Sequence, residues 1–166
     1  IPPALALAEK GQLDYLVFEC LAERTIALAQ LEKIQNPMRG FDPLLSARMK
    51  AVLPACMAHG TRIITNMGAA NPLQAGKEVL AVAKALGLHH LKVAVVLGDD
   101  VLAILQTQYL SEPLMDSTHT VSDIQALLVS ANAYLGAEAL LPALQSDAHV
   151  IISGRVADPA LFLAPL

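Results

Sequence analysis

Two adjacent carboxylates, Asp99 and Asp100, follow Gly98 directly after an apolar run in this sequence. A pair of carboxylates can bind a metal ion, or can share one proton, because two like charges close together raise the pKa of one group. Asp is also a good helix N-cap, so one of the two side chains can instead be structural. Both interpretations place the pair where a strand ends.

Residues 153–159, Ser-Gly-Arg-Val-Ala-Asp-Pro, have the composition of an anion-binding turn. Gly154 leaves room for backbone amides to approach a ligand, and the guanidinium of Arg155 can bind a phosphate or carboxylate in two places at once. Asp158 would hold the guanidinium in position, and a helix opening after it adds the positive end of a dipole. The alternative is an internal pair of Arg155 and Asp158 that only shapes the turn.

Residues 62–72 contain an apolar β-branched run, a turn at Gly68 and a helix opening at Asn71, which is followed by proline. The Asn side chain can cap free amides, and proline fits the first helical position. In open parallel sheets, ligands bind in the crevice outside the carboxyl ends of the strands. We therefore expect Asn66, Gly68 and Asn71 at such a crevice.

Glu19 follows the apolar run 14–18 and precedes Glu23 by four residues. On a helix these two carboxylates would share one face. Glu19 could then act as a base, while a salt link from Glu23 to a nearby Lys or Arg is the more ordinary interpretation. Cys20 and Cys56 stand in apolar settings without disulfide or metal spacing, so we expect buried thiols.

Apolar runs and helical periodicity predict the elements that must position these residues. Residues 126–130 fit a strand, which would place Asn132 at a strand exit, although a capping box of Ser122 and Gln125 would favour a helix; we expect the strand. The irregular stretch 106–124 is typical of a lid or a binding loop. The other expected strands are 14–18, 62–65, 92–97 and 149–152, and the expected helices are 2–10, 21–34, 42–59, 72–86 and 136–145.

The order of strand, small polar turn and helix recurs along the chain and predicts an α/β fold. We expect a predominantly parallel sheet with helices on both faces, open and doubly wound rather than a closed barrel, because the chain does not supply eight strands. At 166 residues, with 55% hydrophobic and 16% charged residues, it suits a single ordered domain. The start at Ile1 and the apolar end at Leu166 suggest a fragment of a longer chain.

Charge and hydropathy limit the classes of partner that we expect for this protein. A net charge of −4 without a basic run makes nucleic acid an unexpected partner. No apolar stretch approaches the roughly 20 residues that span a bilayer, so we expect no membrane partner and a cytoplasmic location. The turn after Asn66 has neither a Walker nor a dinucleotide-binding pattern, and the sequence identifies no cofactor. His89 and His90, at the amino end of a strand, are expected to face solvent.

Five motifs in order resemble the acyclic terpene utilisation family, AtuA: residues 14–23, 66–72, 98–100, 132–137 and 154–159. The resemblance implies a role in the catabolism of acyclic terpenes such as citronellol and geraniol through CoA thioesters, beside a biotin-dependent acyl-CoA carboxylase. It carries no catalytic residue set. It also implies that residues 1–166 lack a preceding Gly-rich strand and a C-terminal part, which members of the family usually have.

Two functions from different classes follow. The first is an enzyme acting on a branched acyl-CoA or its acid, as a lyase or hydratase. In it Asn66 and Asn132 polarise a carbonyl, Glu19 or Asp99 exchanges a proton, and Arg155 holds an anionic group. The second is a non-catalytic assembly or binding subunit for pathway enzymes. The enzyme hypothesis requires these five residues to line one cavity.

Alanine-rich helices with few charges on their outer faces, such as residues 79–86, leave apolar surface uncovered. Large exposed apolar patches usually mark interfaces. We therefore expect a homo-oligomer, or a contact with the remainder of a longer polypeptide.

Overall fold

The computed structural model describes residues 1–166 and contains a four-stranded, all-parallel sheet. The strands lie in the order β1-β2-β4-β3, and the sheet does not close into a barrel. The expectation of an open α/β fold is therefore confirmed. The strands are β1 (Tyr15–Phe18), β2 (Arg62–Thr65), β3 (Val93–Val96) and β4 (Val150–Ser153).

The two central strands are almost completely buried, as their apolar sequences predict. Every residue of β4 is buried, and so are three of the four residues of β2. Thr65 pairs with Phe18 on one side and with Ile152 on the other. Because all strands are parallel, their carboxyl ends meet at one edge of the sheet, which we call the carboxyl edge.

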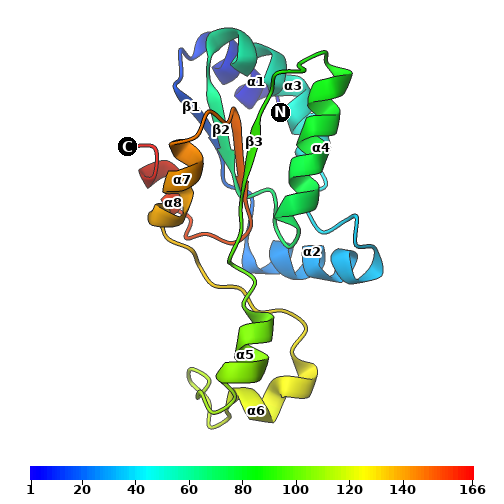
Figure 1. The fold of residues 1–166 in the computed structure, drawn as a ribbon, viewed down its shortest axis with the longest axis vertical. Coiled ribbons are helices and arrows are strands. Elements are labelled where there is room, and N and C mark those ends of the chain that lie inside the picture. Colours follow the sequence, from blue (N-terminus) through cyan, green and yellow to red (C-terminus); the bar gives the residue numbers. More distant parts are fainter.

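Helices cover both faces of the sheet (Figure 1). One face packs against α1 (Pro2–Lys10), α3 (Leu45–His59) and α4 (Pro72–Ala85) in a core of 15 buried residues. The other face packs against the 3-10 helix η2 (Ala137–Leu140), α7 (Leu141–Leu144) and α8 (Ala160–Leu163). None of the helices in the chain is both long and apolar enough to cross a membrane.

Helix α2 (Glu23–Gln35) runs across the carboxyl edge rather than over a face of the sheet (Figure 1). It is bound there by a small apolar cluster that joins Ala29 to the turn after β2 and to the loop after β1. The members of this cluster are Leu21, Ala29, Ala69 and Ala70, with Ile26 packed against them. The helix therefore forms one wall of the crevice at the carboxyl edge.

Residues 101–131 form an arm that extends away from the sheet (Figure 1). It contains α5 (Leu102–Gln108), α6 (Val121–Ile124) and the 3-10 helix η1 (Gln125–Leu127). Val121 is its one buried residue. Few tertiary contacts therefore order this segment.

The prediction of a strand at residues 126–130 is wrong. Thr120 and Asp123 form a capping box two residues before the predicted one, and the helical turns that follow it run through Leu127. No strand of the sheet lies beside this segment to complete its backbone hydrogen bonds, so its β-forming residues cannot make a strand. The chain nevertheless returns to the carboxyl edge, where Asn132 makes an isolated antiparallel bridge with Asp100.

Candidate functional site

Polar residues leave all four strands at the carboxyl edge, as the parallel topology requires. Glu19 follows β1, Asn66 follows β2, Asp99 lies three residues beyond β3, and Arg155 lies two residues beyond β4. Their side chains do not converge on one point. They form two separate clusters.

The first cluster joins Glu19 to Asn66. The Asn66 Nδ2 donates to Glu19 Oε1 over 3.0 Å, and Asn66 Oδ1 accepts from the Cys20 backbone N–H over 2.8 Å. The Leu21 N–H also donates to Glu19 Oε1, over 3.0 Å. Asn66 is fully buried, whereas Glu19 is exposed and its second oxygen has no partner within the chain. Asn66 therefore positions the Glu19 carboxylate, which keeps one free oxygen toward solvent.

The second cluster is built around Asp99, which is only 4% exposed. Its Oδ2 accepts from Asn132 Nδ2 over 3.0 Å and from the Arg155 N–H over 2.8 Å. A Cβ at Gly154 would lie 2.4 Å from the same oxygen, so no side chain fits there. Asp99 thus ties the exit of β3 to the exit of β4 and to the end of the arm. Its neighbour Asp100 is exposed and lies 4.0 Å from Lys33.

The guanidinium of Arg155 is enclosed by the protein. Its Nη2 donates to the Leu21 carbonyl over 2.5 Å and to Asp158 Oδ1 over 3.1 Å. The guanidinium carbon lies 4.7 Å from the centre of the Tyr134 ring, which is cation–π geometry. Nε is buried without a partner.

The internal pair of Arg155 with Asp158, expected as the alternative, is therefore present. The helix expected after it is the single turn α8, too short for an appreciable dipole.

Tyr134 was not expected at the site from the sequence. Its hydroxyl donates to Glu23 Oε1 over 2.5 Å, which lowers the pKa of the Glu23 carboxyl and raises the pKa of Tyr134. Arg155 Nη1 lies 4.0 Å from the same Glu23 oxygen and adds to the lowering. The predicted salt link from Glu23 to a basic residue is thus the weaker of its two contacts, and the hydrogen bond from Tyr134 is the closer one.

Gly68 and Asn71 hold the turn between β2 and α4. A Cβ at Gly68 would lie 2.4 Å from the Ser153 carbonyl oxygen, so the exits of β2 and β4 approach closely only because this residue is glycine. The Asn71 Nδ2 donates to the carbonyls of Pro37 and Arg39, over 2.9 and 2.7 Å. The predicted side-chain cap of α4 is therefore wrong, because the amide turns toward the loop before α3.

An apolar pocket opens beside the Glu19–Asn66 cluster, between α2 and residues 41–43. Its volume is about 130 Å³. We call it the apolar pocket, and the sequence did not predict it. The residues that line it are Cys20, Leu21, Thr25, Leu28, Ala29, Glu32, Phe41, Asp42, Pro43, Asn66, Met67 and Ala69.

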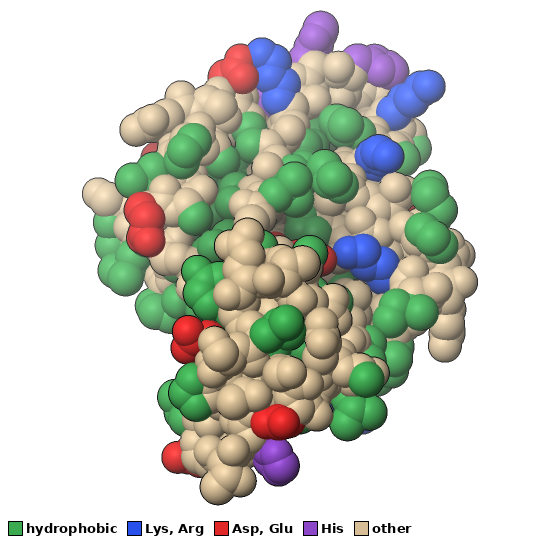
Figure 2. Space-filling model, turned by 60° about the horizontal axis from the view of Figure 1, so that its bottom comes forward, with side chains coloured by type: hydrophobic (Ala, Val, Ile, Leu, Met, Phe, Trp, Pro, Cys, Tyr) green, Lys and Arg blue, Asp and Glu red, His purple; other side chains and the backbone are tan.

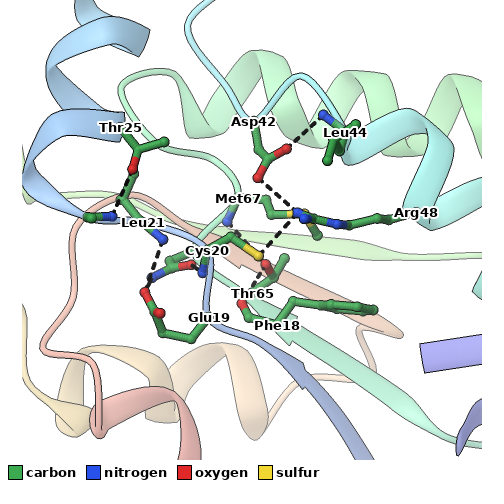
Figure 3. Close-up of polar contacts among 12 residues, drawn as sticks. Phe18, Glu19, Cys20, Leu21, Thr25, Asp42, Leu44, Arg48, Thr65 and Met67 are labelled. Carbon is green, nitrogen blue, oxygen red and sulfur yellow. Dashed lines mark hydrogen bonds and ion pairs between the residues drawn. The ribbon is translucent and has the colours of Figure 1, made fainter. Parts of the chain in front are cut away.

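Arg48 of α3 supports one wall of the apolar pocket (Figure 3). Its Nη1 donates to Asp42 Oδ2 over 2.9 Å and approaches Cys20 Sγ at 3.2 Å and Met67 Sδ at 3.3 Å. Burial raises the pKa of the Cys20 thiol, and Arg48 opposes that shift only in part. Cys20 is half-buried and lines the pocket as a neutral thiol.

A second depression, which we call the polar depression, lies between the Asp99 cluster and the start of α4. Its polar lining residues are Lys33, Asn71, Asp99, Asp100 and Asn132, and its volume is about 230 Å³. The Lys33 Nζ donates to the Ala70 carbonyl over 2.8 Å and lies 4.0 Å from Asp100. No three His, Cys, Asp or Glu side chains in the chain come together as a metal site would require.

The five residues named for the enzyme hypothesis are divided among three neighbouring depressions. Asn66 lines the apolar pocket, and Asp99 lines the polar depression. Arg155 lines a third depression beside Tyr134, and Asn132 lines both the polar depression and the third one. Glu19 lies next to the apolar pocket through its bond to Leu21. A single cavity holding all five residues is not formed.

His89 and His90 are exposed, as expected. Cys56 is buried in α3, as expected, and burial raises the pKa of its thiol to about 11. Asp158 is 64% exposed and reaches the site only through its pair with Arg155.

Comparison with known proteins gives one match. The model of the family described as acyclic terpene utilisation family protein AtuA matches residues 1–166, the whole chain. The chain matches no curated protein and no solved structure. The match agrees with the ordered motifs at the carboxyl edge, where the two clusters lie. The chain belongs to the acyclic terpene utilisation family, AtuA.

Proposed function

We propose that this protein acts on a branched acyl-CoA or its acid, formed during the breakdown of acyclic terpenes, as a lyase or hydratase. The family supports the terpene setting. The observation that carries the proposal is the Glu19 carboxylate, which is held at the carboxyl edge by Asn66 and by the Leu21 amide, beside an apolar pocket.

Glu19 is the residue proposed to move the proton. A hydratase adds a proton and a hydroxyl group across a carbon–carbon double bond, and a lyase of this type reverses such an addition. Either reaction needs a carboxylate whose position is fixed and whose second oxygen is free. Glu19 meets both requirements, since Oε1 accepts two hydrogen bonds and Oε2 accepts none from the chain.

The other candidate residues take supporting roles in this proposal. Asp99 is a second group that could exchange a proton, facing the polar depression. Asn66 and Asn132 act by holding carboxylates rather than by polarising a carbonyl, because their amides are already bonded to Glu19 and Asp99. Gly68, Asn71, Gly154 and Asp158 shape the turns, and Arg155 is the candidate for contact with an anionic group.

Turnover of branched, α,β-unsaturated acyl-CoAs tests this proposal. The product is identified by mass spectrometry as the hydrated thioester or, when the hydrated thioester is supplied instead, as the unsaturated thioester left after loss of water. Glu19→Gln removes the proton-accepting charge and is expected to lower kcat by about 10²- to 10⁴-fold. Glu9→Gln is the control, because Glu9 is an exposed residue of α1 on a helix away from the carboxyl edge. Equal rates in wild type and Glu19→Gln would remove Glu19 from the mechanism.

A non-catalytic binding or assembly subunit is the second candidate. It is favoured by the division of the five residues among three depressions, since catalytic groups ordinarily converge on one. Titration calorimetry distinguishes the two candidates. Binding of a branched acyl-CoA without any turnover, together with co-elution with the acyl-CoA carboxylase of the same pathway, would favour the subunit over the enzyme.

A further inference from the structure

The apolar pocket is bounded by three parts of the chain that meet at the carboxyl edge. Leu28 and Ala29 of α2 form one wall, and Phe41 with Pro43 forms the opposite wall. Met67, fully buried, lies at the inner end. Such a pocket is a preformed site for an apolar group, because its lining has little to offer a polar one.

The size of the pocket limits its occupant. Its volume is about 130 Å³. An engineered apolar cavity of about 150 Å³ in another protein binds benzene, which has six carbons. The pocket therefore holds a group of about five carbons, and a longer chain must leave through its mouth.

The charges around the pocket limit the occupant further. Glu32 and Asp42 are the charged residues in its lining. The cation that contacts this lining, Arg48, is already paired with Asp42 over 2.9 Å. A carboxylate or phosphate would meet net negative charge here, whereas a neutral hydrocarbon would not. The raised pKa of the Cys20 thiol keeps that wall neutral as well.

We infer that the apolar pocket binds the neutral, branched hydrocarbon end of the ligand, a group of about five carbons such as one isoprenoid unit. The inference rests on the proposed function for the rest of the ligand, whose acyl head would lie outside the pocket near Glu19. That carboxylate is bonded to the N–H of Leu21, which lines the pocket.

The test is a titration of the protein, labelled with ¹³C at its methionine methyl groups, with 3-methylbut-2-en-1-ol. The Met67 signal reports on the inner end of the pocket, and the other four methionines are internal references. Met67 is expected to shift and saturate with a Kd on the order of 1 mM, because about five carbons leave water. 3-Methylbutanoate, which has the same carbon skeleton and a carboxylate, is expected to bind more weakly.

Two leucines of α2 give a matched pair of variants. Leu28 lines the pocket and is 50% exposed, and Leu31 does not line it and is 49% exposed. Leu28→Ala is expected to weaken binding of the alcohol by about tenfold, and Leu31→Ala to leave it unchanged. A Met67 signal that does not move, equal weakening in both variants, or tighter binding of 3-methylbutanoate would each overturn the inference.

The outcome is separable from that of the proposed function. Alcohol binding at Met67 without turnover of any acyl-CoA would support the pocket and overturn the lyase or hydratase. Turnover with no response at Met67 would support the enzyme and overturn the pocket.

Discussion

Arg155 and Asp99 are charged side chains that the fold encloses, 2% and 4% exposed. Asp99 accepts the N–H of Arg155, and the Arg155 guanidinium binds the Leu21 carbonyl, 134 residues away in the chain. These bonds link the exits of β1, β3 and β4. A buried ion that loses its partners costs far more than an exposed one, so both residues are expected to be sensitive to substitution.

Arg155→Lys keeps the positive charge but loses the planar, two-point geometry of the guanidinium. With the ligand of the proposed function, a short branched acyl-CoA, this substitution is expected to weaken binding by about 1 to 3 kcal/mol. Because the bonds to Leu21 and Asp158 are also disturbed, the free energy of unfolding should fall by on the order of 3 kcal/mol. Calorimetry and urea denaturation measure the two effects separately.

Asp158→Asn is the control for Arg155→Lys, since Asp158 is 64% exposed and its pair is worth less than about 1 kcal/mol. Equal acyl-CoA affinity in wild type and a normally folded Arg155→Lys protein would leave Arg155 as a structural partner of Asp158.

Cys56 makes stability depend on pH. Burial raises the pKa of its thiol from 9.0 to about 11 in the folded protein. The folded state therefore holds the thiol proton more tightly than the unfolded state does. The stability that this difference contributes is fully present below pH 9 and is lost as the pH rises toward 11. At about 1.4 kcal/mol per pKa unit, the loss is roughly 3 kcal/mol. Urea denaturation of wild type and Cys56→Ala at several pH values measures it, and parallel curves would contradict it.

At the scale of elements, the arm of α5, α6 and η1 differs from the rest of the molecule. Val121 is its one buried residue, whereas five residues of α4 are buried. Local opening is easiest where few apolar contacts are broken. Amide hydrogen exchange followed by mass spectrometry should therefore be faster in residues 102–127 than in α4. Equal protection in the two segments would show that another surface covers the arm.

Over the whole molecule, apolar side chains remain on the surface. Figure 2 shows them spread over the face that includes the arm, with charged groups scattered among them. Apart from the terminal Leu166, the most exposed of them are Met115 at 91% and Leu127 at 78%. Such surface usually marks an interface. We expect light scattering to detect self-association that grows with concentration, and a well-behaved monomer would count against the expected interface.

Local sequence determined most of the elements. Short apolar runs predicted β1 to β4 because a strand buried on both faces needs no alternation. Glycines at the ends of α3 and α4 marked their last residues, and Gly60 and Gly87 indeed have positive φ angles of 72° and 75°. The placement of polar residues after strands also came from the sequence, because parallel strands share one carboxyl edge.

Only the tertiary structure decided which of these polar residues meet. The order β1-β2-β4-β3 places Asn66 against Glu19 and Asp99 against Asn132 and Arg155, pairs that lie 33 to 56 residues apart in the chain. The apolar pocket depends on α2 crossing the edge, which no local pattern reports. The predicted strand at residues 126–130 is absent for the same reason. A strand forms only where another strand pairs with its backbone, and the sequence of one segment does not say which segments lie beside it.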